Sequence, residues 1–310
     1  MDGSPPTEPD AIARALGVTF PELAPLSVRG ILGSGFNSIA VETNGGLVFR
    51  IAKTPGSAER YAREQRLLPV LREHLPIAVP EPRWFVESSP ALPHGAMGYP
   101  KIEGRPLWPS DLDEHNIGPL AGQVAGVLLA LHRIPLAEVE HLGLASHDER
   151  PAGYRALRAE TMPAIRERMS ADEVERIERW WESFLSEERM TRFEPVVAHG
   201  DFWFENMIVD DGATQLVGVV DWEHAALADP ALDFSTVLHL GVDFLARTLG
   251  AYRVEGGRFD AEDMYRMGRL WELRHFYGVL YSVRFQDREE MGDSIRKIRE
   301  GPLFDTPGAP

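Results

Sequence analysis

Two acids and an amide stand beside short apolar runs in the second half of the chain. Asp201 and Asn206 lie in the segment HGDFWFEN, between the runs VVA and MIV, and Asp221 ends the run LVGVVD. A loop held at both ends by strands can present a carboxylate that accepts a hydroxyl proton, while amide and carboxylate oxygens coordinate Mg²⁺. This order of strands, acids and amide is typical of phosphoryl transfer. It predicts Asp201 as the acid/base, with Asn206 and Asp221 as metal ligands.

Other residues of the same region have simpler expected roles. His199 is expected to tether the backbone of the loop. Asp229 and Asp233, in DPALDF, are expected to anchor a loop and cap a helix. Any one of the acids taken alone is explained equally well by a turn or a cap, so the prediction depends on the whole set.

A glycine-bearing turn near the N-terminus is a candidate phosphate site. Two strands joined by such a turn can direct backbone N–H groups at a phosphate, because glycine permits close approach and unusual dihedral angles. A plain hairpin turn needs the same residue types. The turn matches neither G-x-G-x-x-G before a helix nor G-x-x-x-x-G-K-[ST], which disfavours the dinucleotide and P-loop folds. The candidate residues are Gly33, Ser34, Gly35, Asn37 and Ser38.

A strand cation and a helix acid follow this turn. Arg50 lies in LVFRIAK and Glu64 in the next predicted helix, an order that allows an ion pair able to grip nucleotide phosphates. Lys53 and Glu59 are alternatives, and all four side chains could instead be solvent-exposed charges.

The elements that must position these residues form two groups. The first is a helix in AIARALGV, strands at 28–32, 38–43 and 47–52, a helix at 57–73, and strands at 78–87 and 96–102. The second is helical at 120–133, 155–169, 172–187 and 261–300, with a small β insert around VVAH and LVGVVDW. We therefore predict an α+β fold of two lobes, residues 1–102 and 103–310.

The composition of the chain limits the classes of partner that it can bind. The formal charge of −16 opposes nonspecific binding to nucleic acid and suits a cationic ligand if the acids line a cleft. There is no cysteine, no signal-peptide pattern and no apolar run long enough for a membrane span. These features predict a cytoplasmic protein without nucleic-acid or membrane partners, either monomeric or homodimeric.

HGDFWFEN followed by VVDWEHAALADPALDF resembles the catalytic segment of the aminoglycoside phosphotransferase family. LGSGFNS, VFRIAK, HLPIAVPEP, YPKIEGRPL and LLALHRIPL occur in family order, so the resemblance covers nearly the whole chain. It implies a two-lobed, protein-kinase-like fold with ATP or GTP and Mg²⁺ between the lobes. It also implies that Arg50 grips phosphate with Glu64 as its partner. Two features argue against a protein kinase. Asp221 is followed by Trp-Glu and not by Phe-Gly, and the chain has no room for an activation segment.

The resemblance also indicates where the nucleotide base and the acceptor bind. The linker GYPKIEG, with Tyr99, Lys101 and Ile102, would offer backbone groups to the purine, and Tyr99 occupies the gatekeeper position. The acceptor would be an aminoglycoside-type antibiotic, as in antibiotic resistance. The acceptor candidates are Glu223, Trp271, Glu272 and His275.

Alternatives to this function stay open. The acceptor could be a macrolide phosphorylated at its 2'-hydroxyl, or an amino alcohol or sugar in a housekeeping reaction. A catalytically silent nucleotide-binding scaffold is the non-enzymatic alternative.

Overall fold

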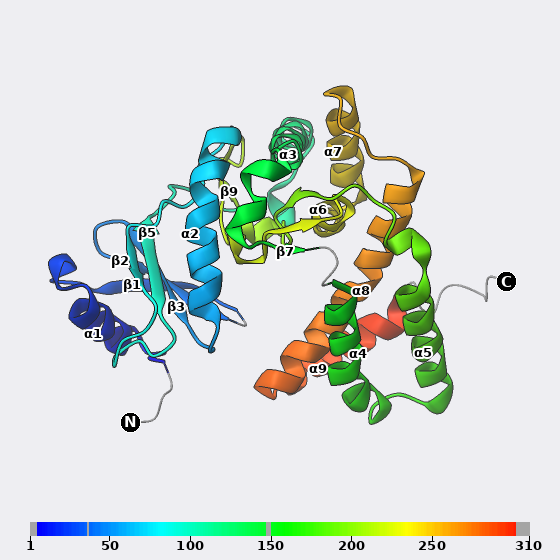
Figure 1. Cartoon of the computed structure of the whole chain (residues 1–310), viewed down its shortest axis with the longest axis horizontal. Coiled ribbons are helices and arrows are strands. Elements are labelled where there is room, and N and C mark those ends of the chain that lie inside the picture. The colour runs from blue at the N-terminus through cyan, green and yellow to red at the C-terminus, as the bar shows by residue number, and fades with distance from the viewer. Residues whose placement is uncertain (1–4, 36, 147–149, 302–310) are drawn as a thin grey trace.

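The computed structural model describes residues 5–35, 37–146 and 150–301. Phe36 of the glycine-bearing turn and the first four residues of the polar N-terminal segment lie outside this part. The expected α+β class is confirmed: a sheet with two helices comes first, and a mainly helical part follows (Figure 1).

An antiparallel sheet of five strands forms the first part, in the order β1-β2-β3-β5-β4. Helices α1 and α2 lie on its opposite sides (Figure 1). The elements are α1 (Pro9–Thr19), β1 (Val28–Ser34), β2 (Ser38–Thr43), β3 (Leu47–Ala52), α2 (Ser57–His74), β4 (Trp84–Val86) and β5 (Ala96–Pro100).

Alternation along the strands decides which helix each side chain meets. Val41, Phe49 and Ile51 pack with α1, whereas Val48 and Ala52 pack on the side of α2. Arg50 shares the parity of Val48 and Ala52, so the strand pattern turns this cation toward α2.

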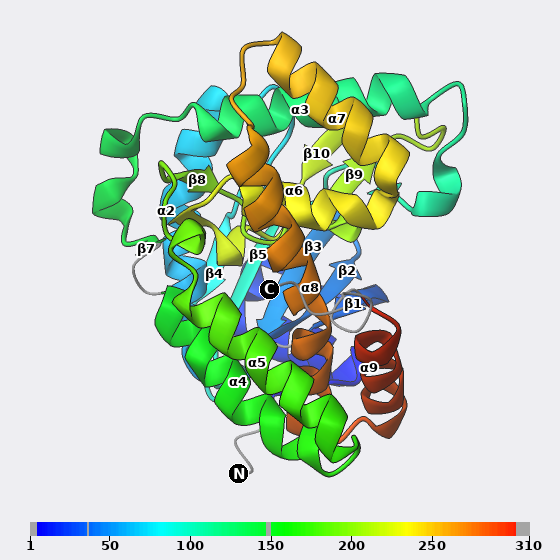
Figure 2. The same cartoon turned by 90° about the vertical axis from the view of Figure 1, so that its right-hand side faces the viewer.

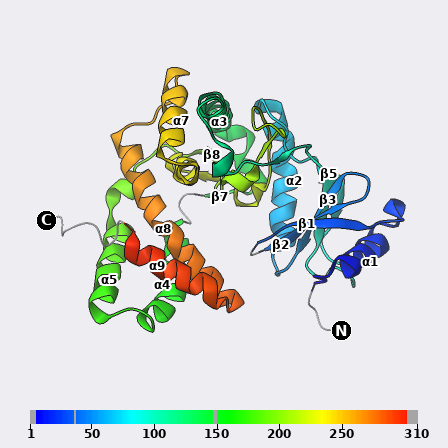
Figure 3. The ribbon, with the colours of Figure 1, turned by 180° about the vertical axis from the view of Figure 1, so that it is seen from behind.

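Helices make up most of the second part. Helix α3 packs against α7, while α4 packs against α5 and α8 (Figure 2). The long helix α8 runs from α6 toward α4 and α9, as the view from behind shows (Figure 3). The helices are α3 (Ile117–His132), α4 (Arg150–Arg166), α5 (Ala171–Ser186), α6 (Ala231–Val237), α7 (Val242–Val254), α8 (Ala261–Phe285) and α9 (Arg288–Glu300).

Two small sheets support the loops of the second part. One has the order β10-β9-β6 and the other β7-β11-β8. Their strands are β6 (Arg105–Pro106), β7 (Ala145–Ser146), β8 (Val196–Ala198), β9 (Met207–Val209), β10 (Leu216–Val219) and β11 (Ala226–Ala228).

The main hydrophobic core spans both parts of the chain. Leu67, Leu68 and Leu71, from the second half of α2, are buried in the same cluster as the helical part. The helix that carries the site acid Glu64 is therefore fixed to both parts. Among the described residues no single helix is long and apolar enough to cross a membrane. Helix α3 and the segment Leu136–Leu142 reach that length and apolarity only when taken together, and the angle between them is 72°.

One element prediction was wrong over most of its length, and the structure adds a break to another. Within the predicted strand at 78–87 only Trp84–Val86 is a strand, because Pro80 and Pro82 lack the N–H group that a ladder needs. The predicted helical tail at 261–300 is two helices, with Gln286 in the left-handed region and Asp287 capping α9.

Candidate active site

The segment after β8 is held in place by a buried aspartate. The backbone N–H groups of His199 and Gly200 each donate to Asp233 at 2.9 Å. Nε2 of His132 lies 3.3 Å from the same carboxylate, and its Nδ1 lies 3.0 Å from the Tyr252 hydroxyl. Burial by itself raises the pKa of Asp233, but His132 and the hydrogen bonds outweigh burial and hold that pKa below its usual value. Asp233 is thus the anchor of this segment.

Gly200 occupies a position that no other residue fits. Its φ is +82°, and a Cβ atom there would lie 2.2 Å from the carbonyl oxygen of His224. The neighbouring His199 side chain is buried, with Nε2 3.0 Å from the carbonyl oxygen of Val220. These contacts join the loop that carries Asp201 to the end of β10, where Asp221 follows.

Asn206 lies between the two acids. Its Nδ2 donates to the backbone oxygen of Asp201 at 3.0 Å and lies 3.5 Å from Oδ2 of that residue. Its backbone oxygen accepts from the N–H of Val220 at 3.0 Å, one residue before Asp221. Since its amide nitrogen is committed to Asp201, the amide oxygen of Asn206 remains the group for a cation.

Asp221 has an unusual backbone conformation. Its φ of 65° and ψ of 60° lie in the left-handed region, which costs a non-glycine residue about 1 kcal/mol or more. Such conformations persist where the surrounding structure enforces them, often at functional sites.

Arg50 gathers three carboxylates from both parts of the chain. Its Nη1 donates to Glu64 on α2 at 2.7 Å, which is the expected ion pair. Its Nη2 lies 2.7 Å from Oδ1 of Asp221 and 2.9 Å from Oε2 of Glu223. The last two contacts lack hydrogen-bond geometry, so both buried oxygens have close charge contact with Arg50 but no hydrogen-bond donor. Glu223 also accepts from Nδ2 of Asn37 in the glycine-bearing turn, at 3.0 Å.

Burial, with neighbouring acids adding to it, raises two pKa values in the site. Burial raises the pKa of Glu64 to about 7, with Arg50 opposing it and Asp221 and Glu223 reinforcing it. Burial is also the main cause that raises the pKa of Asp201; the charge of Asp221 adds to it, while His224 opposes it. The site therefore holds more negative charge than Arg50 balances, an arrangement that favours a bound cation.

One cavity of about 620 Å³ brings the predicted nucleotide and metal residues together. We call it the interlobe cavity. Glu64 is not part of its wall and lies buried behind Arg50. Among its lining residues are Gly33, Ser34, Gly35, Asn37, Ser38, Arg50, Tyr99, Lys101, Ile102, Asp201, Asn206, Asp221 and Glu223.

Some details differ from the sequence-based expectation. Gly33 and Gly35 do not have positive φ, so only their lack of a side chain serves the turn. The N–H of Lys101 already donates to the oxygen of Gly46 and is not available to a purine. The alternative cation Lys53 binds Ser34 and Gly35 inside the turn instead of pairing with a helix acid.

A second cavity, of about 420 Å³, opens beside Asp201, and we call it the acceptor cavity. Of the predicted acceptor residues, Trp271 lines it. Glu272 is absent from its wall, because its carboxylate accepts from Trp180 at 2.6 Å and from Arg269 at 2.7 Å. His275 is also absent from this wall, and burial lowers its pKa to about 3. Glu223 lines the interlobe cavity and is committed to Arg50.

Several residues of the site were missed by sequence reasoning. His132 ends an apolar helix, and a histidine there gives no signal of its contact with Asp233 across 101 residues. Trp203 lies between the two predicted site residues of HGDFWFEN and lines both cavities, so its position was a usable signal. His239 and Arg274, which line the acceptor cavity, had no distinguishing pattern in the sequence.

A family model and curated relatives match this chain. A family model described as "Phosphotransferase enzyme family" matches residues 29–270. The uncharacterized protein YcbJ of Bacillus subtilis (strain 168) is 26% identical over 280 residues, which cover 83% of each chain. Viomycin phosphotransferase of Streptomyces vinaceus is 30% identical over 105 residues, covering 33% of this chain and 36% of the relative.

Solved structures share the fold. One is an aminoglycoside 2''-phosphotransferase in complex with GDP and kanamycin, with a TM-score of 0.78, 20% identity, and coverage of 93% of this chain and 97% of that one. Another is the macrolide 2'-phosphotransferase MphH from Brachybacterium faecium, with a TM-score of 0.65, 21% identity, and coverage of 97% and 100%. The expected kinase-like architecture is thereby confirmed.

Proposed function

The chain belongs to the phosphotransferase enzyme family, and from this premise we propose that it moves the γ-phosphate of ATP or GTP to a hydroxyl of a small molecule with the help of Mg²⁺. On this proposal residues 1–102 supply most of the nucleotide site, and residues 103–310 supply the catalytic residues and the acceptor site. The acceptor cavity would then receive the hydroxyl compound beside Asp201.

The observation that carries the proposal is the lining of the interlobe cavity. It joins a glycine-bearing turn, the buried cation Arg50, and the set Asp201, Asn206 and Asp221, which are more than 100 residues further along the chain. A nucleotide-binding scaffold would need the turn and the cation. It would have no use for a carboxylate at the junction of two cavities, which is where Asp201 lies.

The residues present fit a magnesium ion. Oδ1 of Asp221 is buried without a hydrogen-bond donor, and the amide oxygen of Asn206 is turned away from the bond that its nitrogen makes to Asp201. Among the described residues no group of three or more His, Cys, Asp or Glu side chains forms a metal site. Mg²⁺ usually takes only one or two carboxylates and fills its remaining positions with phosphate oxygens and water, so this pair is sufficient. When bound, the ion would neutralise charge on the phosphate oxygens.

Asp201 would orient the acceptor hydroxyl and take its proton. Its raised pKa makes it a stronger base than an exposed aspartate once it is ionised. Arg50, held by Glu64, would contact the phosphates, and the N–H groups of the turn around Gly33 and Gly35 would lie against them. Catalysis would therefore rest on positioning and electrostatic stabilisation.

The identity of the nucleotide and the identity of the acceptor are supported by different observations. Structural neighbours have been solved with GDP, with ADP and with ATP, which supports a nucleoside triphosphate without choosing the base. Tyr99 lines the interlobe cavity, so we keep it as the proposed gatekeeper. An aminoglycoside acceptor draws its support from neighbours solved with kanamycin, gentamicin and streptomycin. The walls of the acceptor cavity favour different chemistry, because one of them is aromatic and carries Arg274.

Replacement of Asp201 tests the proposal. The variant Asp201→Asn keeps the shape of the side chain but removes the base, so turnover should fall at least about 100-fold. Nucleotide binding, measured by calorimetry, should be retained, because Arg50 and the turn are untouched. The exposed Asp211→Asn variant is the matched control and should keep full turnover.

The assay is nucleoside diphosphate release with ATP and with GTP, over a panel of hydroxyl compounds. Full activity of Asp201→Asn would refute the assigned role. Absence of turnover by the wild-type protein over the whole panel would favour the scaffold.

A further inference from the structure

Aromatic side chains form one wall of the acceptor cavity. The ring of His239 lies between two indoles, with its centroid 4.1 Å from that of Trp203 and 4.5 Å from that of Trp271. Burial lowers the pKa of His239 to about 4, so this ring is neutral at pH 7. Tyr154 and Tyr277 add further aromatic surface. This wall matches a flat or ring-containing apolar body.

The acceptor cavity does not share the strongly acidic character of the chain. The protein carries a net charge of −16, yet among the described residues Asp201 is the only carboxylate that lines this cavity. Arg274 lines it too, with its guanidinium 3.6 Å from the centroid of the Trp271 ring and Nη1 donating to the backbone oxygen of that residue at 2.6 Å. A polyammonium acceptor would meet a cation here rather than a cluster of acids.

Arg274 is half-buried and differs from three other arginines that are buried or half-buried. Arg50 pairs with Glu64, Arg266 with Asp229, and Arg269 with Glu272. Within residues 5–35, 37–146 and 150–301, no carboxylate comes within ion-pair distance of Arg274. Its pKa is lowered to about 10, chiefly by burial, so it remains charged at pH 7. A half-buried cation without a carboxylate partner, facing a cavity, is a natural site for an anionic ligand group.

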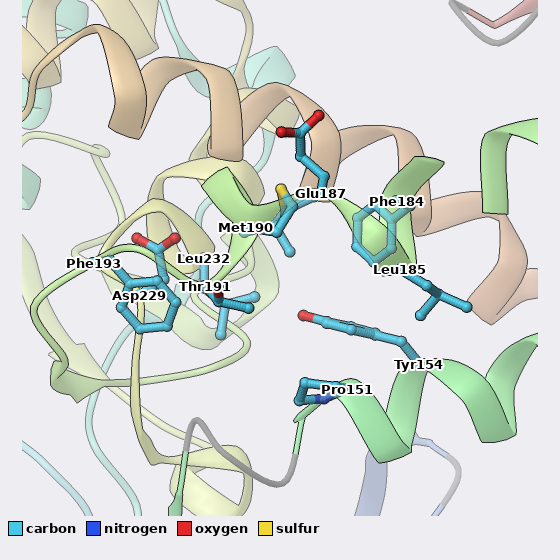
Figure 4. A pocket seen from close by; sticks show the side chains of 11 residues that line it. Pro151, Tyr154, Phe184, Leu185, Glu187, Met190, Thr191, Phe193, Asp229 and Leu232 are labelled. Carbon is cyan, nitrogen blue, oxygen red and sulfur yellow. The ribbon is translucent and has the colours of Figure 1, made fainter. Parts of the chain in front are cut away.

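A smaller cavity of about 190 Å³ extends the acceptor cavity, and the two share Tyr154, Leu232 and Leu270. Figure 4 shows Tyr154 beside this space, with Leu185 and Phe184 from α5 on one side and Leu232 on the other. Two carboxylates also line it, but both have partners. Glu187 accepts from the hydroxyl of Tyr265 at 3.2 Å, and Asp229 binds Arg266 at 2.5 Å. An apolar part of the ligand therefore has room beyond the aromatic wall.

We propose that the acceptor is a hydroxyl compound with an apolar, ring-containing body and an anionic group, which lies against the aromatic wall and pairs with Arg274. This inference rests on the proposed function, since it places the phosphorylated hydroxyl at Asp201. Asp201, the single carboxylate among the described lining residues, serves the hydroxyl, and Arg274 binds the acidic group. Because Arg274 already covers one face of Trp271, that ring offers little to an ammonium group.

A charge series of matched ligands tests the inference. Tropic acid, its methyl ester, and the amino alcohol with an aminomethyl group in place of the carboxyl share a phenyl ring and a primary hydroxyl. Binding of each, and of kanamycin, is measured by calorimetry on the full chain saturated with a non-hydrolysable ATP or GTP analogue and Mg²⁺. The acid should bind about tenfold more tightly than the ester, as expected for one charge-assisted hydrogen bond. The amino alcohol and kanamycin should bind more weakly than the ester.

Variants of Arg274 locate the effect. Arg274→Gln should remove the advantage of the acid over the ester, and Arg274→Lys should restore part of it. The control Arg247→Gln changes an exposed arginine on α7 that pairs with Asp243, and should keep the advantage. If Arg274→Gln fails to fold, the ranking of the ligands on the wild-type protein decides alone.

The outcomes separate the two proposals. Tightest binding of the amino alcohol or kanamycin, equal binding of acid and ester, or no binding of any probe at millimolar concentration would overturn the inference. The proposed function would survive each of these results provided that the nucleotide analogue binds. Failure of both nucleotide analogues to bind would instead overturn the proposed function.

Discussion

Replacement of Asp233 by asparagine should destabilise the protein strongly, although this residue touches neither proposed substrate. The wild-type carboxylate is fully buried and accepts from the N–H groups of His199 and Gly200, both at 2.9 Å, with His132 at 3.3 Å. Asparagine has one oxygen, so at least one backbone N–H group would face an amide nitrogen that cannot accept. A buried donor without a partner costs about 1–3 kcal/mol, and the remaining bonds lose the charge that strengthens them.

The sum is a loss of about 3 kcal/mol, or roughly a 100-fold fall in the ratio of folded to unfolded protein. The lowered pKa of Asp233 also indicates that its ionised form stabilises the folded state. A carboxyl group whose folded pKa lies below its unfolded value stabilises the fold above the unfolded pKa, and this stability is lost as the pH falls through the folded value. The ionised form is therefore the one that holds the loop at pH 7.

Urea unfolding at pH 7, followed by tryptophan fluorescence, measures the loss. The matched control is Asp243→Asn, an exposed aspartate of α7 paired with Arg247, which should change the unfolding free energy by less than about 0.5 kcal/mol. Below the unfolding transition, Asp233→Asn should also lower kcat more than it changes the KM for nucleotide, because it displaces the segment that carries Asp201. A loss no greater than that of the control would refute the assignment of Asp233 as the anchor of the loop.

Two further predictions concern the same loop. Gly200→Ala should cost at least about 1 kcal/mol of stability and most of the activity, because φ is +82° and the new Cβ would lie 2.2 Å from the oxygen of His224. The control Gly122→Ala in α3, with open space around the new Cβ, should leave the stability equal or higher. Equal melting temperatures for the two variants would contradict this prediction. Because the pKa of Asp201 is raised, kcat/KM should fall on the acid side at a pH above the ordinary aspartate pKa of about 4. Activity is lost as the pH falls through the pKa of Asp201, because the protonated carboxyl is no longer a base. A pH profile that stays flat down to about pH 4 would exclude Asp201 as the base.

Local patterns were sufficient for the elements whose residues interact along the chain. The predicted strands at 38–43 and 47–52 coincide with β2 and β3, because alternation and an Asn-Gly-Gly turn fix a hairpin locally. The helix predicted at 57–73 ends one residue later in the structure. The apolar pattern at 78–87 predicted one long strand, but Pro80 and Pro82 lack the N–H groups that a strand needs there, so the strand is short.

Contacts between distant segments could not be predicted in the same way. The pairing of Arg50 with Glu64 was expected from their order along the chain, a strand cation before a helix acid, but the contacts of Arg50 with Asp221 and Glu223 join it to residues more than 150 positions away. Glu272 was chosen for its charge and lies on α8, as predicted, yet the indole of Trp180 on α5 binds it away from the acceptor cavity. Helical periodicity shows which residues share a face of α8 but does not show what that face packs against.

The crowding of three carboxylates around Arg50 implies a competition that nucleotide binding must resolve. On the proposed assignment, phosphate oxygens compete for the guanidinium with Asp221 and Glu223, which are 2.7 and 2.9 Å from Nη2. Glu223 keeps Arg60 at 3.8 Å, but Asp221 loses its contact with Arg50 and becomes a better ligand for a divalent cation. Nucleotide and Mg²⁺ should therefore promote each other's binding, and because such coupling is reciprocal, each should raise the affinity of the other by the same factor.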